Sequence, residues 1–418
     1  MKSLGKTFQI HTFGCKLNFS ESSEIARRLV EGGMALAERN PDYIIVNSCA
    51  VTATAEKKGR NDIARIHREN PSSGIVVVGC HSSLRPEEIS QWQGVVKVFG
   101  NRDKMSVVDF LLGHGVGEAP RFFSSYSSND RTRSFLKIQD GCDCHCAYCT
   151  VADARGESRS DTIENVLKNI EKIAAEGINE VILTGVNLGD FGKGTSENFY
   201  KLLQAIEKQH LIRRFRISSI EPYLLTDEII NLVASSEIIM PHFHIPLQNG
   251  SDKILTLMSR RYSADFFAKK ILTVKEKIPD ACIALDVISG FPSETDEDFE
   301  DSYNLINRLP ISYLHVFTYS RRPGTPAYSM KEQVPEPVKR QRTNRLLELS
   351  EEKKKIFYTQ HLGEARPVLW ESDKKSGLMF GFTDNYIKVK KPFDTESINT
   401  ITEFELTEEN ILLNESHK

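Results

Sequence analysis

Three cysteines in the first half of the chain, Cys142, Cys146 and Cys149, form a C-x3-C-x2-C triplet that is short enough to lie on one loop. Three thiolates at this spacing can each bind one iron of a cubane iron–sulfur cluster, which leaves the fourth iron without a protein ligand. An open coordination position is typical of a catalytic metal site. The open iron can chelate the amino and carboxylate groups of S-adenosylmethionine (SAM), and an electron from the cluster then cleaves SAM to a 5′-deoxyadenosyl radical. The triplet therefore predicts a 4Fe-4S cluster that binds SAM.

A structural zinc site, or a set of buried thiols, is the alternative interpretation of this triplet. Four-ligand zinc sites usually contain paired Cys or Cys/His elements, and no second pair follows here. Cys144 and His145 add two candidate ligands, but adjacent residues do not easily close one tetrahedron. Tyr148, directly before the last cysteine, favours the radical cluster, since an aromatic side chain there can shield the adenine of SAM. In this stretch the chain resembles the radical SAM superfamily.

Composition excludes some classes of function and leaves others open. The chain has 418 residues, which is too long for one ordinary core and predicts two to three domains. Its 54 Lys and Arg nearly balance its 57 Asp and Glu, so any RNA site must be a local patch. The N-terminus has no apolar signal core, and no apolar run of about 18 residues occurs, so we expect a cytoplasmic protein with no membrane partner. In that reducing compartment the cysteines favour metal ligation or burial over disulfides.

Residues 1–113 alternate apolar runs with amphipathic stretches, as in a βαβ pattern. A helix begins at Asn18 or Ser20, either of which can cap it, and ends near Glu31. The continuous apolar runs are typical of central strands in a parallel sheet. We therefore expect an α/β protein in which residues 1–113 form a small doubly wound domain. Its four predicted strands are Phe8–Thr12, Tyr43–Val46, Ile75–Val78 and Val95–Phe99.

Three further cysteines each follow one of the first three strands of this domain. They are Cys15, Cys49 and Cys80. Loops beyond the carboxyl ends of parallel strands converge on one edge of the sheet, so these thiols can meet around a second cluster. Taken singly, each would instead be a buried small hydrophobic residue. A glycine precedes Cys15 and Cys80, which suits a turn where backbone approaches a cluster closely.

The next part of the chain predicts a linker and then a barrel. Residues 114–133 lose periodicity and are rich in Gly and Ser, which indicates a linker. In residues 134–333, helices such as Asp161–Glu176, capped by Ser160, and Thr295–Arg308 separate six candidate strands. Six βα units predict a partial (βα)6 barrel with its function at the carboxyl ends of the strands. The strands are Phe135–Gln139, Glu180–Thr184, Phe215–Ser219, His242–Ile245, Ile283–Ile288 and Tyr313–Thr318.

Polar residues at these strand ends are the candidate SAM contacts, together with Tyr148. Gly185 would let backbone carbonyls approach the ammonium of SAM, and Glu221 or Gln248 could accept hydrogen bonds from ribose hydroxyls. Each residue could equally be a loop cap or a surface polar group. The full set after the strands is Thr184, Gly185, Glu221, Gln248 and Asp286.

The C-terminal part changes from helix to strand character. Residues 334–363 form a charged helix, Pro335 to about His361, whose charges are either a solvated face or part of an RNA path. Residues 364–418 contain short alternating strands and turns, which predict a small β-barrel of the OB-like type, a common nucleic-acid module. Lys388 and Lys390 alternate with apolar residues there and would lie on the outside.

The whole order resembles the methylthiotransferase family of radical SAM enzymes. Within that family, the Gly14–Asn18 and Thr184–Gly192 stretches look most like the MtaB branch, which acts on N6-threonylcarbamoyladenosine in tRNA next to the anticodon. The resemblance implies an N-terminal cluster domain, a radical SAM core and a C-terminal TRAM domain that grips tRNA. Other matching stretches are Gly141–Cys149, Ala154–Gly156, His244–Gln248, Asp286–Pro292 and Tyr319–Ala327.

This resemblance also implies a reaction and its partners. One SAM would methylate a sulfide on the N-terminal cluster, and a second would supply the radical that removes hydrogen from carbon 2 of the adenosine. The partners would be a tRNA anticodon stem-loop and an electron-donor protein, with the sulfur source open. Arg155, Arg321 and Arg322 are candidate donors to the threonylcarbamoyl group, and each could equally form a structural salt bridge.

Some residues depart from the family pattern, and other functions remain open. Ala152 and Asp153 stand where family members have Pro and an apolar residue, and Cys144 adds a fourth thiol to the cluster loop. Cys282 fits an inert core thiol. The alternatives are a branch that modifies isopentenyladenosine in tRNA and a branch that modifies an aspartate of a ribosomal protein. A non-catalytic iron–sulfur protein that binds RNA or stores sulfur is a different class of function.

Overall fold

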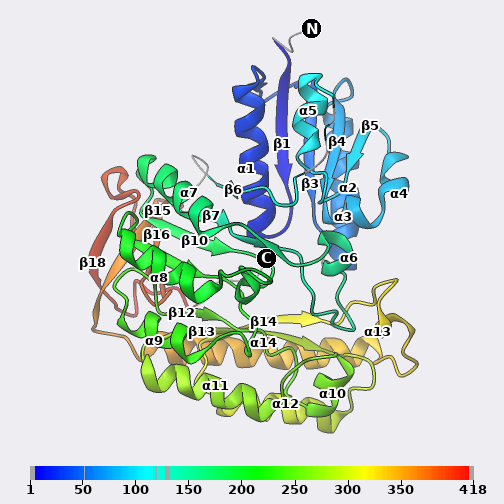
Figure 1. Cartoon of the computed structure of the whole chain (residues 1–418). Helices are drawn as coiled ribbons and strands as arrows, with labels where there is room; N and C mark the ends of the chain where they lie inside the picture. The colour runs from blue at the N-terminus through cyan, green and yellow to red at the C-terminus, as the bar shows by residue number, and fades with distance from the viewer. Residues whose placement is uncertain (1–4, 51, 116, 118–119, 128–131, 414–418) are drawn as a thin grey trace.

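The first part of the fold is a five-stranded parallel sheet at the top of the molecule in Figure 1. The computed structural model describes residues 5–50, 52–115, 117, 120–127 and 132–413. The strand order is β2-β1-β3-β4-β5, with every pair parallel. The strands are β1 Thr7–Thr12, β2 Ala35–Leu36, β3 Tyr43–Ser48, β4 Gly74–Gly79 and β5 Val95–Phe99. The helices are α1 Lys16–Glu31, α2 Ala53–Glu69, α3 Cys80–Leu84, α4 Pro86–Ser90 and α5 Ser106–Leu112.

Helices cover both faces of this sheet, which explains its continuous apolar strands. Ile45 and Val76 pack with Ile25 of α1 on one face. Ile44 and Ile75 pack with residues of α2 and α4 on the other face. Side chains of alternate residues therefore enter two separate cores, and neither set faces water. The predicted doubly wound fold is confirmed.

The predicted cap of the first helix is wrong. Helix α1 begins at Lys16 with Cys15 as its N-cap, so Asn18 and Ser20 lie inside the helix. The turn before it is tight because Gly14 has a φ of +111°. The Asn18 side chain donates instead to the carbonyl oxygens of Phe13, at 2.7 Å, and Ser48, at 3.2 Å. It thereby fixes the turn that carries Cys15.

The core is an open barrel of six parallel strands below this sheet (Figure 1). One half has the order β11-β10-β7, with β6 (Ser125–Tyr126) antiparallel at its edge, and the other half has β12-β13-β14. Bridges from Phe215 to Ile239 and from Ser219 to His244 join the halves. The predicted partial barrel is confirmed. Its strands are β7 Ser134–Lys137, β10 Glu180–Thr184, β11 Arg214–Ile217, β12 His242–His244, β13 Cys282–Ser289 and β14 Tyr313–Thr318.

Helices on the outside of the barrel complete each unit. Thr162, not the predicted Ser160, caps the first large one, because Ser160 pairs with Gln139 in a short ribbon of β8 (Gln139–Asp140) and β9 (Arg159–Ser160). Thr295 and Asp298 form a capping box at the start of α12, as its acidic opening predicts. The helices are α6 Val151–Arg155, α7 Ile163–Ala175, α8 Phe199–Gln209, α9 Asp227–Ser235, α10 Asp252–Leu257, α11 Ala264–Lys277, α12 Asp296–Arg308 and α13 Pro326–Ser329.

The charged C-terminal helix, α14 (Glu336–Thr359), lies along β14 and packs on the core. Lys339, Arg342 and Lys353 are buried, so the helix is not a fully solvated charged face. Arg342 donates to Glu294 and to Asp296, each at 2.7 Å. Much of its charge therefore holds the helix against the barrel. No helix among the described residues is long and apolar enough to cross a membrane.

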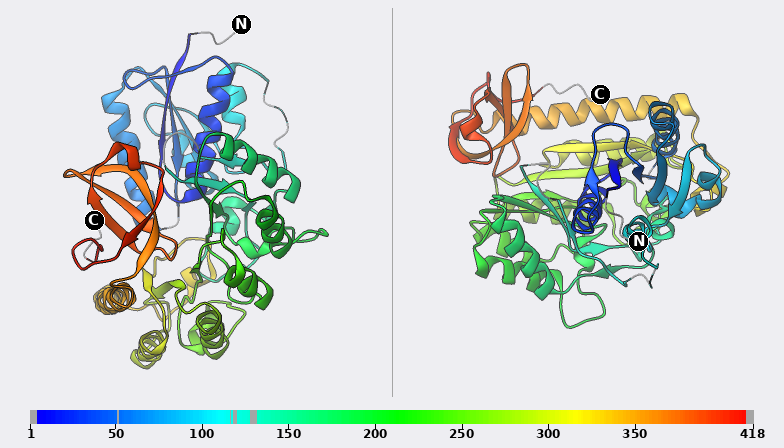
Figure 2. Two further views of the ribbon diagram at one scale, coloured as in Figure 1. Left: turned by 90° about the vertical axis from the view of Figure 1, so that its left-hand side faces the viewer. Right: turned by 90° about the horizontal axis from the view of Figure 1, so that it is seen from above.

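An antiparallel sheet follows α14 and packs at the side of the barrel (Figure 2). Its order is β17-β16-β15-β18, and Trp370, Ile387 and Val389 form its core together with Phe357 of α14. This curved sheet agrees with the predicted small barrel, of which residues 414–418 lie outside the described residues. The strands are β15 Ala365–Lys375, β16 Leu378–Thr383, β17 Lys388–Pro392 and β18 Ile401–Glu405.

Two arginines of the core fasten this sheet. Arg214 donates to the carbonyl oxygens of Pro367, at 2.6 Å, and Phe382, at 3.1 Å. Arg216, which is buried, donates to the carbonyl oxygens of Thr383, at 2.7 Å, and Asp384, at 2.8 Å. These charge-assisted bonds give the sheet a fixed position on the core.

Candidate active site

The C-x3-C-x2-C triplet lies in the wall of a cavity of about 280 Å³ at the carboxyl ends of the core strands. Cys142, Cys146 and Cys149 sit on the loop between β8 and α6. The loop starts at Gly141, where φ is +73° and a Cβ atom would collide with the carbonyl oxygen of Glu157. The backbone N–H of Cys142 donates to Gly156 O at 3.0 Å, which closes the loop on itself. The structure thus brings the three predicted ligands to one cavity.

Burial disfavours ionisation of two ligand thiols of this loop, those of Cys146 and Cys149. Burial raises the pKa of Cys149 to about 12 and also raises the pKa of Cys146. A bound metal deprotonates such thiols directly, so they fit an iron–sulfur cluster. Cys144 lines the same cavity, and hydrogen bonds with Cys142 and Tyr223 lower its pKa to about 6.

Four of the predicted SAM contacts line this cavity, and two do not. Tyr148, Glu221, Gln248 and Asp286 are in its wall. Thr184 is buried and its hydroxyl donates to the carbonyl oxygen of Ile182, at 2.9 Å.

Gly185 also lies outside the wall and makes room for Gln139. A Cβ atom at Gly185 would lie 2.8 Å from the Oε1 atom of Gln139. That oxygen accepts the backbone N–H groups of Val186, at 2.8 Å, and Asn187, at 2.9 Å. The end of β10 therefore reaches the cavity through Val186 and Asn187.

Two contacts in the wall show how the fold positions these residues. Gln248 has a φ of +66°, which is unusual for a residue other than glycine, and its backbone bridges to β13. Asp286 accepts a hydrogen bond from His244 at 2.7 Å, and this partner lowers its pKa against the effect of burial. His315 lies beside this pair, and the three side chains could also hold a metal ion.

Arg260 is a site residue that the sequence did not reveal. One terminal nitrogen of its guanidinium donates to the sulfur of Cys146 at 3.2 Å, and the other donates to Glu221. Arg260 therefore fixes a cluster ligand and a predicted SAM contact at once. Arg260 belongs to no recognisable sequence motif, so only the folded structure identifies it as a site residue.

The three N-terminal cysteines come together at the carboxyl edge of the upper sheet. Cys15 caps α1, Cys49 follows β3, and Cys80 is the first residue of α3 rather than part of a loop. A Cβ atom at Gly14 would lie 2.8 Å from the Cβ atom of Cys49. A Cβ atom at Gly79 would lie 2.8 Å from the backbone nitrogen of Ser48. The turn before Cys15 therefore contacts Cys49, and the turn before Cys80 contacts Ser48, the residue before Cys49.

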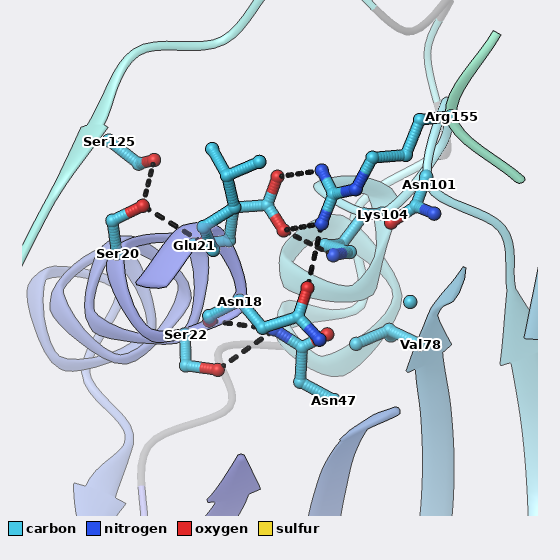
Figure 3. Close-up of polar contacts among 12 residues, drawn as sticks. Asn18, Ser20, Glu21, Ser22, Asn47, Val78, Asn101, Lys104, Ser125 and Arg155 are labelled. Carbon is cyan, nitrogen blue, oxygen red and sulfur yellow. Dashed lines mark hydrogen bonds and ion pairs between the residues drawn. The ribbon is translucent and has the colours of Figure 1, made fainter. Parts of the chain in front are cut away.

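A buried polar network joins this edge to the core (Figure 3). Arg155 of α6 donates to Asn18 at 2.7 Å, to Glu21 at 3.1 Å and to Asp140 at 2.9 Å. Its side chain is only 3% exposed and lies outside the cavity wall. The structure thus places this predicted substrate contact between the two domains. Ala152 and Asp153 lie within α6, so the missing proline leaves a regular helix turn before Arg155.

The charge on Arg155 also acts on the N-terminal thiols. Burial opposes this charge, but nearby sulfurs and carboxylates raise the pKa of Arg155 well above its ordinary value. The sulfurs are those of Cys80 and Cys15.

The remaining candidate substrate contacts divide between the cavity and the surface. Arg322 lines the cavity, and it donates to Glu56 and, at 3.1 Å, to the carbonyl oxygen of Ala50, the residue after Cys49. Arg321 is exposed, and its Nε donates to the carbonyl oxygen of Tyr328 at 2.9 Å. Lys388 and Lys390 lie on β17, where they alternate with buried Ile387 and Val389 as predicted. Neither lysine lines the cavity.

Comparison with known proteins agrees with this arrangement. Residues 136–306 match the radical SAM superfamily, and residues 7–100 match a family described as uncharacterized protein family UPF0004. The chain is 36% identical to threonylcarbamoyladenosine tRNA methylthiotransferase MtaB of Bacillus subtilis, over 92% of this chain and 90% of that protein. It is 34% identical to tRNA-2-methylthio-N(6)-dimethylallyladenosine synthase of Carboxydothermus hydrogenoformans, over 82% of this chain and 83% of that protein.

A solved structure shows the same fold at low sequence identity. The radical SAM methyltransferase TsrM of Kitasatospora setae aligns with a TM-score of 0.60 and 14% identity, over 77% of this chain and 75% of TsrM. The cysteine loop at the barrel mouth and the upper sheet with its own cysteines match the two family regions. From the geometry and the relatives together, the chain belongs to the radical SAM methylthiotransferase family.

Proposed function

We propose that this protein transfers a methylthio group to carbon 2 of N6-threonylcarbamoyladenosine in tRNA, next to the anticodon, with one SAM as methyl donor and one as radical source. One observation carries the proposal: the wall of the cavity with the core triplet includes a residue of the N-terminal domain, three positions after Cys49. Its wall includes Thr52 and Arg322, and Arg322 donates to the residue after Cys49. A radical generator and a sulfur donor must both reach one substrate carbon, so this proximity is what the reaction requires.

The cavity residues have distinct roles in this proposal. Cys142, Cys146 and Cys149 would hold a 4Fe-4S cluster, and Tyr148, Glu221, Gln248 and Asp286 would surround SAM. When bound, the reduced cluster and SAM supply a 5′-deoxyadenosyl radical. Arg260 orients Cys146 and Glu221 through its two hydrogen bonds. The aromatic cluster of Tyr148, Phe291 and Tyr319 excludes water from one wall.

A second 4Fe-4S cluster on Cys15, Cys49 and Cys80 belongs to the same proposal. The contacts of Gly14 and Gly79 support it, because they bring the three cysteine turns together. This cluster would carry the sulfide that receives the methyl group. The electron-donor protein and the sulfur source are left open.

The tRNA would bind across the C-terminal sheet and the barrel mouth. We assign residues 364–418 to a TRAM-like module, residues 134–333 to the radical core and residues 1–113 to the N-terminal domain. Lys388 and Lys390 would contact phosphates, and Arg321 and Arg322 would approach the modified base. The target base must leave its stack, which costs less in a single-stranded loop than in a duplex. A cytoplasmic location follows from this substrate.

Nucleoside analysis tests the substrate directly. Protein loaded with iron and sulfide is given SAM, a chemical reductant, and either tRNA carrying threonylcarbamoyladenosine or tRNA carrying isopentenyladenosine in the same assay. We expect a methylthio product by mass spectrometry on the first tRNA and little on the second. A preference for the second tRNA would show that the substrate is isopentenyladenosine and not threonylcarbamoyladenosine. SAM cleavage with no product on either tRNA would direct attention to a ribosomal protein.

A further inference from the structure

The buried network between the two domains has more positive than negative charge. Lys104, Lys137 and Arg155 are each at most 3% exposed at the side chain, and so are the carboxylates of Glu21 and Asp140. Among the residues that the structure describes, this network therefore holds three buried cations against two buried anions. Figure 3 shows part of it, with the Glu21 carboxylate joined by dashed lines to Lys104 and to Arg155.

The extra cation is best identified as Lys104. Glu21 already accepts hydrogen bonds from Lys137, at 2.9 Å, and from Arg155, at 3.1 Å. Asp140 accepts from Arg155 at 2.9 Å and lies 3.1 Å from the Lys137 ammonium. Each carboxylate thus has two cationic partners besides Lys104.

A buried charge that is not fully balanced by opposite charge destabilises a fold. The ammonium of Lys104 is fully buried, and Glu21 is its only hydrogen-bond partner given by the described contacts. Arg159 adds a further cation at the rim, where it donates to Asp140 at 2.8 Å. The side chains of the network therefore carry surplus positive charge that an additional anion would balance.

The N-terminal cysteines lie where this anion is needed. Lys104 follows β5 at the sheet edge where Cys15, Cys49 and Cys80 also lie. Arg155 donates to Asn18, which holds the turn of Cys15. Helix α3, which begins at Cys80, packs against α6, which carries Arg155. A cubane cluster held by three thiolates carries a net negative charge of about one unit in its usual oxidised state. Its negative charge is opposite in sign to the surplus of the network.

We propose that Lys104, together with Arg155, is the buried counter-charge of the cluster on Cys15, Cys49 and Cys80, and so sets that cluster's retention and redox potential. The inference rests on the second cluster of the proposed function. Lys104 is a positioning residue in this role, because its ammonium acts on the cluster through the electric field and binds none of its atoms. The same network joins the cluster to the core, since Arg155 follows the core triplet on α6.

The test uses the full chain with Cys142, Cys146 and Cys149 replaced by Ala, so that only the N-terminal cluster is present. Lys104→Met keeps the length of the side chain and removes its charge. Lys97→Met, at an exposed lysine of the same domain, is the matched control. Iron content, the midpoint potential of the cluster and the melting temperature of the iron-free protein are measured for each variant.

If Lys104 is the counter-charge, Lys104→Met should have opposite effects on the iron-free and the iron-loaded protein. Without iron, Lys104→Met should melt at the same or a higher temperature, because the surplus charge is gone. With iron, the variant should retain less than half of the iron, and the midpoint potential should be more negative, since the reduced cluster loses a stabilising cation. Lys104→Arg should restore both readouts.

Specific outcomes would overturn the inference. Unchanged iron content and potential in Lys104→Met would remove the counter-charge role and leave the second cluster intact. A lower melting temperature of iron-free Lys104→Met would make Lys104 a structural ion-pair partner of Glu21 instead. If the protein with intact Lys104 binds no iron in this background, the proposed second cluster itself is wrong.

Discussion

The guanidinium of Arg155 donates a hydrogen bond to the side-chain oxygen of Asn18 at 2.7 Å. Arg155 follows the core cysteine triplet, whereas Asn18 follows Cys15 and holds its turn through the carbonyl oxygens of Phe13 and Ser48. A single side-chain contact thus connects the loops of both triplets. Because both residues are buried, the connection is protected from competition by water.

Removing this connection should destabilise the whole protein. Arg155→Met eliminates the hydrogen bonds to Asn18, Glu21 and Asp140, so each of these buried acceptors loses one donor. We expect the free energy of unfolding of the iron-free protein to fall by about 3–5 kcal/mol in urea titrations. Arg321→Met, at an exposed arginine, should change it by less than about 0.5 kcal/mol. Equal effects of the two substitutions would contradict the structural role of Arg155.

The same network predicts how stability depends on pH. Burial alone would raise the pKa of Glu21, but its cationic partners lower it well below the ordinary value. A carboxylate with a lowered folded-state pKa stabilises the fold above its unfolded pKa of about 4, and this contribution is lost as the pH falls further. We therefore expect the urea midpoint of the iron-free protein to fall steeply below about pH 4. Glu21→Gln should be less stable at pH 7, and its urea midpoint should fall less steeply below about pH 4. If the two curves of urea midpoint against pH are parallel, Glu21 is not the cause of the pH dependence.

Arg260 should matter for SAM binding more than for iron binding. Arg260→Met removes the donor to Cys146 and leaves Glu221 without its cation. Burial already raises the pKa of Glu221, and the substitution raises it further, so the carboxyl becomes a poorer acceptor. We expect SAM affinity of the iron-loaded protein to fall by about tenfold or more, with iron content retained. The neighbouring, exposed Arg261→Met is the control, and equal losses in both variants would contradict a specific role.

The two triplets should have separable activities. Cys15→Ala should abolish methylthio transfer, because the sulfur-donating cluster would lose a ligand. Reductive cleavage of SAM should continue, since Cys142, Cys146 and Cys149 are unchanged. The two activities can be measured in one reaction by nucleoside mass spectrometry and by 5′-deoxyadenosine release. Loss of both in a folded protein would argue against the division of labour.

The lysines of β17 should contribute to tRNA affinity and not to the radical chemistry. Lys388→Gln with Lys390→Gln removes two cations that lie away from the cavity. We expect weaker tRNA binding and a salt dependence whose slope falls by about two units, with SAM cleavage without tRNA unchanged. Lys269→Gln with Lys277→Gln, on α11, serves as the charge-matched control. An unchanged slope would place the RNA contacts elsewhere.

Local patterns explain which features could be predicted from the sequence. The apolar runs at Ile44 and Ile75 identify central strands because the burial of both faces leaves no polar position. The spacing of the cysteines in Cys142–Cys149 identifies metal ligands on one loop, because all three lie within one short stretch of sequence. The alternation at Ile387 and Val389 identifies the outward lysines of β17.

Features that depend on distant contacts could not be predicted in this way. Cys15 is the N-cap of α1 because the turn before it, at Gly14, contacts Cys49, which follows a different strand. Arg260 bonds Cys146 over a separation of 114 residues, and Lys104 bonds Glu21 over 83 residues. Nothing near either residue in the chain indicates its partner. Arg155 is predicted from its place after the cluster loop to contact substrate, and in the structure it bonds Glu21 of the N-terminal domain and Asp140 of its own.

The attachment of the C-terminal sheet by Arg214 and Arg216 has a consequence for target choice. Four carbonyl oxygens of the sheet are bonded to these two side chains, so the sheet cannot swing relative to the barrel. With RNA bound as proposed, the span from β17 to the cavity acts as a molecular ruler. It would select a nucleotide by its distance along the backbone from the phosphates that Lys388 and Lys390 are proposed to contact, without reading the identity of the bases in between.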